Sequence, residues 1–252
     1  MIDGKPGTMS RDYWDTVAAD YDGSVLSVFD HDVENGIQRR VDELADRGAR
    51  AADLGCGVGK FTPMLSACFG HVEACDLSPR CLERARVRCQ GVGNVRFHQF
   101  DFTSEPAPFE PVAFAFCVNV LLMPSLDDRM RAWRLVANQV AQGGHLLLVV
   151  PAHESILFQS YLAVSDGLNA GLGCEQAVEE AVVGAGSARE KQLGVHALDG
   201  RPTKHYLADE LRALLCEHHF DVLELAKFEY ELTNDGGVVD RFWDWLAVGR
   251  RR

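Results

Sequence analysis

The stretch from Ala51 to Lys60 constrains the fold of this chain more than any other part of it. It reads Ala-Ala-Asp-Leu-Gly-Cys-Gly-Val-Gly-Lys, a short apolar run that leads into three alternating glycines, with Asp53 two residues before the first glycine. Glycine permits positive φ and lets a ligand approach the backbone closely, and a helix that follows begins with unpaired N–H groups. We therefore predict a buried strand, a ligand-binding glycine loop and a helix, with Asp53 at the carboxyl edge of an open α/β sheet.

The spacing of these glycines differs from that of two common nucleotide-binding loops. The dinucleotide fingerprint Gly-x-Gly-x-x-Gly needs a glycine where this chain has Lys60, and no Gly-Lys-Ser/Thr of a P-loop follows. The segment instead resembles motif I of the class I S-adenosylmethionine-dependent methyltransferases, Asp/Glu-x-Gly-x-Gly-x-Gly. The resemblance implies that Asp53, Gly55, Cys56 and Gly57 bind S-adenosyl-L-methionine, with the loop behind its methionine part. A glycine loop of another α/β protein is the alternative.

Acids at the ends of the next two predicted strands extend the resemblance. The second strand ends in Asp76, 23 residues after Asp53, and an acid at this place can accept the ribose hydroxyl hydrogens of an adenosine. Leu77 follows it and joins the predicted cofactor site. The third strand ends in Asp101 and Phe102, which in the family meet the adenine amino group and ring. A turn-forming acid beside a core phenylalanine is the alternative for this pair.

Two more segments complete the predicted cofactor site. Residues 11–30 resemble the segment of many small-molecule methyltransferases that folds over the cofactor, so that Tyr13 and Tyr21 would lie against it. An ordinary amphipathic helix is the alternative. The fourth predicted strand ends at Asn119 and Val120, beside which the family places the sulfonium and the incoming substrate. Asn119 is the one polar group in an apolar run and therefore needs a partner or a ligand.

The order of the predicted elements matches the class I methyltransferase fold, an α/β, doubly wound, seven-stranded and mostly parallel sheet with one antiparallel strand. Apolar runs separated by helical periodicity predict the first five strands, and a turn-rich gap predicts a terminal hairpin. The predicted strands are 51–54, 71–76, 94–102, 111–120, 145–150, 220–232 and 238–248. The predicted helices include one at 34–47, and another whose apolar face runs from Met130 to Val140.

Residues 152–206 stand out because they form a long connection with weak periodicity. We interpret them as a helical lid that shapes the substrate pocket, with helices at about 154–166 and 175–190; a disordered linker is the alternative. The predicted single methyltransferase domain has four parts: an N-terminal cofactor-covering segment, a cofactor-binding core, the lid insertion, and a final helix with the terminal hairpin. These parts are residues 1–36, 37–151, 152–206 and 207–252.

Composition excludes several other classes of protein. The net charge of −12 argues against a nucleic-acid binder, and no apolar run reaches the roughly 18 residues of a membrane span. The N-terminus has no apolar region of a secretory signal. The eight cysteines include no Cys-x-x-Cys pair, which favours a reduced cytoplasmic enzyme without a metal site. We expect a small-molecule substrate and leave open whether the chain is a monomer or a homodimer.

Methyl transfer from a sulfonium is an in-line displacement, so the protein mainly positions the acceptor and excludes water. A base is needed only if the acceptor carries a proton that must leave. The candidates are His153, His205, Tyr206 and His31, each with a structural role as the alternative. The acceptor atom could be oxygen, nitrogen or carbon. A protein or metalloid methyltransferase, or a regulatory protein that binds the cofactor, is the alternative function. A nicotinamide-dependent oxidoreductase is disfavoured by Lys60 and the terminal hairpin.

Overall fold

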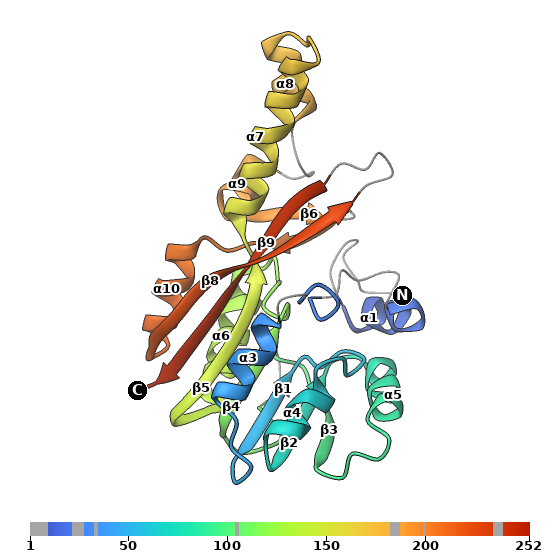
Figure 1. Cartoon of the computed structure of the whole chain (residues 1–252), viewed down its shortest axis with the longest axis vertical. Coiled ribbons are helices and arrows are strands. Elements are labelled where there is room, and N and C mark those ends of the chain that lie inside the picture. Colours follow the sequence, from blue (N-terminus) through green and yellow to red (C-terminus); the bar gives the residue numbers. More distant parts are fainter. Residues whose placement is uncertain are drawn as a thin grey trace.

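The computed structural model describes residues 10–21, 28–32, 35–103, 106–181, 187–198, 200–233 and 239–252. A seven-stranded sheet with helices on both faces forms the centre of the molecule (Figure 1). Its strands are β1 (Arg50–Leu54), β2 (His71–Asp76), β3 (Val95–Gln99), β4 (Val112–Val118), β5 (Val140–Pro151), β8 (Phe220–Thr233) and β9 (Val239–Arg251). The core helices are α3 (Gly36–Glu43), α4 (Thr62–Cys68), α5 (Pro79–Arg88), α6 (Leu126–Asn138) and α10 (Ala208–Glu217).

The strand order β3-β2-β1-β4-β5-β9-β8 confirms the predicted fold class. The first five strands pair in parallel, and β9 lies antiparallel between β5 and β8. Parallel strands bring their carboxyl ends to one edge of the sheet, which is where open α/β sheets bind ligands. The ends of β1, β2 and β4 therefore place Asp53, Asp76 and Asn119 at the same edge.

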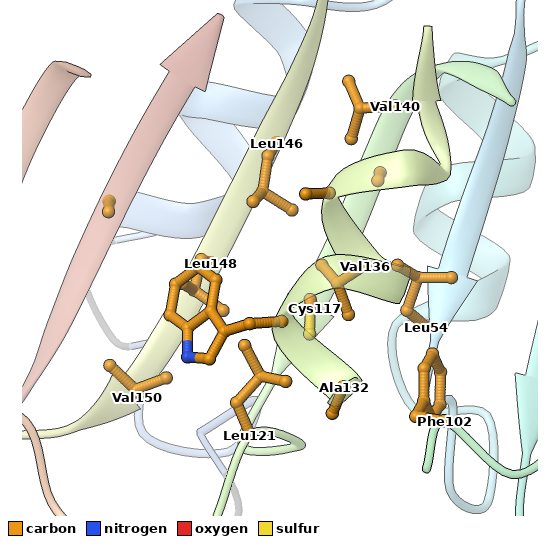
Figure 2. Close-up of a cluster of buried hydrophobic side chains, with 14 of the residues drawn as sticks. Leu54, Phe102, Cys117, Leu121, Ala132, Val136, Val140, Leu146, Leu148 and Val150 are labelled. Atoms are coloured by element: carbon orange, nitrogen blue, oxygen red, sulfur yellow. The ribbon is translucent and has the colours of Figure 1, made fainter. Parts of the chain in front are cut away.

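Two apolar layers hold the sheet between its helices. On one face, side chains of α6 pack on strand residues that include Leu54, Cys117 and Leu148 (Figure 2). Side chains of α10 belong to the same cluster. On the other face, Ile37 of α3 and Leu65 of α4 pack on the opposite side of the same strands. Because β4 and the second half of β5, from Leu146 to Val150, are covered on both faces, they are almost continuously apolar. This explains why their sequences lack the alternation of a strand that faces water.

Several predicted boundaries differ from the structure. The helix predicted at 34–47 is limited to α3, because the Asp32 carboxylate caps its first turn by accepting the N–H groups of Gly36 and Ile37, 2.6 and 2.9 Å away. Val140 begins β5 and pairs with Val112, so its assignment to the preceding helix is wrong. The third strand ends at Gln99, and Phe100 and Phe102 turn into the core behind it.

The segment from 152 to 206 contains helices and a hairpin. The predicted helix at 154–166 lies within α7 (His153–Asn169), which rises away from the sheet with α8 (Cys174–Glu180) at its far end (Figure 1). The second predicted helix, 175–190, is wrong as one element: α8 ends at Glu180 and α9 covers Ala188–Gln192. A hairpin of β6 (Val195–Leu198) and β7 (Arg201–Lys204) was not predicted, because strands of four residues are too short to show alternation.

The insertion is anchored to the core at its first turn. The carboxylate of Glu154 accepts hydrogen bonds from Ala208 N, at 2.8 Å, and from Trp245 Nε1, at 3.0 Å. These bonds join α7 to α10 and β9. Before the insertion the chain forms α1 (Arg11–Val17) and a 3₁₀ turn, η1 (Ala18–Asp20). Within the described ranges no helix is both long and apolar enough to cross a bilayer.

Tyr206 is fully buried at the end of the insertion and joins three elements. Its hydroxyl donates a hydrogen bond to the carbonyl oxygen of Leu121 at 2.6 Å and accepts one from Trp133 Nε1 at 3.2 Å. Its backbone N–H bonds to Pro151 O at 2.8 Å. Burial also raises the pKa of the phenol. These contacts give Tyr206 a structural role between the core and the insertion.

We expect Tyr206→Phe to lower the free energy of unfolding by about 1–3 kcal/mol, because it leaves the buried Leu121 carbonyl and the Trp133 indole N–H without this partner. Urea denaturation followed by tryptophan fluorescence measures the change. Tyr161→Phe is the matched control, since Tyr161 is 66% exposed and should tolerate the same substitution without loss. Equal stability of both variants and the wild type would contradict this role for Tyr206.

Candidate functional site

A cavity of about 1270 Å³ opens at the carboxyl edge of the sheet. All the residues predicted to bind the cofactor line it: Tyr13, Tyr21, Asp53, Gly55, Cys56, Gly57, Asp76, Leu77, Asp101, Phe102, Asn119 and Val120. Of the predicted catalytic candidates, His31 and His205 also line it, whereas His153 and Tyr206 lie outside its lining. The structure therefore gathers residues from the N-terminal segment, the core and the insertion around one space.

The glycine loop runs close to its neighbours, and two of its glycines have no room for a side chain. Gly55 has φ 76°, and a Cβ there would lie 2.2 Å from Cγ2 of Val120. Gly57 has φ 53°, and its Cβ would lie 2.7 Å from the Tyr21 hydroxyl oxygen. The N–H groups of Gly55 and Cys56 both bond to Cys75 O, at 2.8 and 2.9 Å. The loop is thus held against the ends of β2 and β4.

Asp76 is held in place by the loop that it faces. One of its carboxylate oxygens accepts a hydrogen bond from Gly57 N and the other accepts one from Ser78 N, both at 2.9 Å. Each oxygen has a second lone pair, so a vicinal diol can still donate to both. Burial raises the pKa of this carboxyl to about 6, although the two N–H groups act in the opposite direction. Asp76 is therefore a partly buried acceptor whose charge depends on pH near neutrality.

Asp53 is 3% exposed and lies on the cavity wall at the end of β1. The hydroxyl of Thr62, at the start of α4, donates to its Oδ2 at 2.6 Å. Burial raises the pKa of the carboxyl to about 7, and the nearby charge of Asp76 adds to the rise. Two acids in one cavity with raised pKa values indicate a site that would favour a cation or hydrogen-bond donors.

Asp101 forms a turn and also lines the cavity, so it combines the two roles considered for it. Its Oδ1 accepts hydrogen bonds from the N–H and the hydroxyl of Thr103, at 2.8 and 2.7 Å, which forms a turn at the end of β3. The same residue lines the cavity. Phe102 also lines the cavity, although it is only 5% exposed and belongs to the core. A turn role and a role toward a ligand are compatible here.

The insertion and the N-terminal helix meet beside the cavity. The guanidinium of Arg201, on β7, lies 4.0 Å from the centre of the Tyr13 ring on α1, within the range of a cation–π contact. The insertion also contributes Ser155, Ile156 and Thr203 to the cavity wall.

The three histidines of the insertion pack together. His196 lies between His153 and His205, with ring centres 4.8 and 5.3 Å away. Burial lowers the pKa of His196 to about 4 and that of His205 to about 3, and it also lowers that of His153. These rings are neutral near pH 7 and are weak bases. Among the described residues, no group of three or more His, Cys, Asp or Glu side chains could hold a metal ion.

Sequence reasoning missed a polar cluster on the terminal hairpin. Asp244 of β9 is 3% exposed, lines the cavity and accepts a hydrogen bond from the Tyr230 hydroxyl at 3.2 Å. Its other oxygen lies 3.5 Å from Nδ2 of Asn119. Trp243, beside it, also lines the cavity. One signal was present: an acid between two tryptophans in a strand is a candidate for a buried functional charge.

Comparison with known proteins identifies methyltransferases. A family described as a methyltransferase domain matches residues 51–144. Trans-aconitate 2-methyltransferase of Streptomyces coelicolor is 33% identical over 120 residues, which are 45% of this chain and 38% of that protein. The chain thus aligns with less than half the length of this curated relative.

Solved structures share the fold over nearly the whole chain. The DhpI–SAM–HEP complex superposes with a TM-score of 0.63 at 20% identity, covering 99% of this chain and all of that one. The N-methyltransferase NodS of Bradyrhizobium japonicum, in complex with S-adenosyl-L-homocysteine, gives 0.61 at 15% identity and covers 96% and 97% of the two chains. At these identities the likeness concerns the fold.

Gly55→Ala should destabilise the protein far more than Gly91→Ala. Both glycines have positive φ, 76° and 88°, so both substitutions carry the backbone strain of about 1–2 kcal/mol. Only the Gly55 variant adds a clash with Val120, since a Cβ at Gly91 meets nothing within 4 Å. Thermal unfolding of the two purified variants measures the difference. Equal melting temperatures would contradict the close approach of the loop to Val120.

Proposed function

We propose that this chain, a class I S-adenosylmethionine-dependent methyltransferase by its matched domain and its fold, transfers the methyl group of S-adenosyl-L-methionine to a small-molecule acceptor. The family was predicted from the glycine motif, and the domain match includes that motif. The cofactor would lie along the carboxyl edge of the sheet, where the predicted binding residues line the cavity.

The observation that carries this proposal is the placement of Asp53, Asp76 and Asp101 around one cavity together with the glycine loop. The cofactor has a cationic amino group, a ribose diol and an adenine amino group, and all three donate hydrogen bonds. An acid at each of three successive strand ends offers acceptors for these donors. We assign the ribose to Asp76, whose two oxygens are already oriented by Gly57 and Ser78.

The fold also disfavours the oxidoreductase alternative. A Cβ at Gly59 would lie 3.0 Å from the Cβ of Ala85, so this glycine provides the close contact between the loop and α5. Lys60 follows it and forms an ion pair with Asp30 at 2.6 Å. In a dinucleotide fold these positions would serve a pyrophosphate. Here Gly59 packs on α5 and Lys60 pairs with an acid, which suits a cofactor without phosphate.

Positioning accounts for the chemistry that this site needs. The sulfonium is already an activated electrophile, so the protein must align the acceptor with the methyl–sulfur bond and keep water out. Asn119 would stand beside that bond. It has φ 54°, and its backbone N–H bonds to Val149 O at 2.9 Å, which fixes the residue at the end of β4. Backbone strain in a non-glycine residue at a cavity wall is typical of functional sites.

Calorimetric titration with S-adenosylhomocysteine, with NADH as the control, tests the proposal. We expect micromolar binding of the first ligand, about −8 kcal/mol, and none of the second. Binding of NADH alone would overturn the cofactor assignment. A regulatory protein that binds the cofactor without catalysis would show S-adenosylhomocysteine binding but no methyl transfer to any extract fraction that contains small molecules.

Asp76→Ala should weaken binding of S-adenosylhomocysteine at least about tenfold. It removes two hydrogen bonds to a charged acceptor, each of which contributes about 1.5–3 kcal/mol. Asp166→Ala is the control. It also removes an acid, but Asp166 lies on the far part of α7 and does not line the cavity. Calorimetry of the three proteins measures the change. An unchanged affinity in the folded Asp76 variant would remove the ribose assignment.

Affinity for S-adenosylhomocysteine should fall at least about tenfold between about pH 8 and about pH 5. The carboxylate is the form that accepts two hydroxyl hydrogens, and the pKa of Asp76 is about 6, so protonation at low pH removes acceptors. Asp53, with a pKa of about 7, acts in the same direction. Binding measured across this range in the wild type and in Asp76→Asn checks the sign. Affinity that rises as the pH falls would contradict it.

A further inference from the structure

The cluster of Asp244, Asn119 and Tyr230 is structurally linked to the glycine loop. Val120 contacts Gly55, and the preceding residue, Asn119, points its amide nitrogen at Oδ2 of Asp244. Asp244 lies on β9 opposite Pro151, the last residue of β5. The acid therefore stands at the same carboxyl edge of the sheet as the proposed cofactor site, on the side toward the terminal hairpin.

The polar atoms of this cluster are only partly satisfied within the described part of the chain. A buried carboxylate needs several short hydrogen bonds, yet Asp244 has two long ones, 3.2 Å from the Tyr230 hydroxyl and 3.5 Å from Asn119 Nδ2. The amide oxygen of Asn119 is buried and has no described partner, and neither has the indole N–H of Trp243. The Asp244 carboxylate, on the cavity wall, thus has acceptor capacity left for a ligand that carries an N–H group.

Aromatic rings lie beside the Asp244 carboxylate on the cavity wall. Tyr230, Phe242 and Trp243 all line the cavity, and the rings of Tyr230 and Phe242 stack with centres 6.4 Å apart. The ring of His31 lies 5.7 Å from that of Tyr230. A carboxylate among aromatic rings favours a cationic or N–H-bearing group. It disfavours a carboxylate ligand, which would meet the charge of Asp244.

We propose that Asp244, held by Asn119 and Tyr230, forms the acceptor subsite of this enzyme and that the methyl acceptor is a primary or secondary amine. This inference rests on the proposed function. The amine donates an N–H group to the Asp244 carboxylate, which directs its lone pair at the methyl carbon. The new nitrogen–carbon bond forms as the carbon–sulfur bond breaks, and that electron pair stays on sulfur. The proton lost from nitrogen passes to Asp244 and then to solvent.

The burial of Asp244 suits it to the proton transfer. Removal from water raises the pKa of its carboxyl to about 6, while the hydrogen bonds from Asn119 and Tyr230 act in the opposite direction. A carboxylate with a raised pKa takes a proton more readily near neutral pH than an exposed one. Asp244 would thus be a catalytic residue, whereas Tyr230 and Asn119 hold it in place.

Binding of sinefungin tests the acceptor subsite even though the methyl acceptor has not been identified. In this analogue of the cofactor a carbon that bears an amino group replaces the sulfonium and its methyl group, so an N–H donor stands where the methyl would be. We expect the wild type to bind sinefungin at least about tenfold more tightly than S-adenosylhomocysteine in calorimetry. In Asp244→Asn this ratio should fall close to one, while the affinity for S-adenosylhomocysteine stays the same.

Two further variants complete the test. Asp128→Asn neutralises another carboxyl on the cavity wall, on α6 and outside this cluster, and should leave the ratio as in the wild type. Tyr230→Phe keeps the packing and should lower the ratio of the two affinities by a smaller factor. This variant provides the test if the Asp244 variant does not fold. Normal S-adenosylhomocysteine binding with an unchanged ratio in both cluster variants would overturn the acceptor subsite. Absence of S-adenosylhomocysteine binding in the wild type would instead overturn the proposed function, and this inference with it.

Discussion

The close contact between the glycine loop and the end of β4 is the constraint on which the site depends. Gly55 lies so near Val120 that no side chain fits between them, and this contact fixes the loop relative to β1, β2 and β4. The loop in turn orients Asp76 through Gly57 N. Asn119, next to Val120, reaches Asp244 on the terminal hairpin. The contact of the Gly55 backbone with the Val120 side chain thus connects the proposed cofactor site with the proposed acceptor site.

A second feature of the site is that carboxyl groups removed from water lie where we expect a cationic ligand. Asp53 and Asp244 are each 3% exposed and Asp76 is partly buried, and removal from water raises the pKa of each carboxyl to about 6 or 7. Carboxyl groups removed from water need hydrogen-bond partners. A ligand that brings a sulfonium and several N–H or O–H donors would satisfy them, so binding energy and specificity come from the same groups.

Much of the fold could be predicted from the sequence, because motifs and apolar periodicity can be recognised within short segments of the chain. The acids at strand ends and the two apolar faces follow from short patterns around Asp53, Asp76 and Leu148. The β6–β7 hairpin could not be predicted, since its strands are short, and Val140 fits a helix or a strand equally well. Asp244 was missed because its role depends on Asn119, 125 residues away in the chain, and such pairing is visible only in three dimensions.

A crystal structure with S-adenosylhomocysteine would show directly whether the three strand-end acids and the glycine loop bind S-adenosylmethionine. We expect the ribose hydroxyls to lie within hydrogen-bond distance of both Asp76 oxygens, and the sulfur to lie between the glycine loop and Asn119. A ligand bound elsewhere in the cavity, with Asp76 contacting only Gly57 and Ser78, would contradict this expectation.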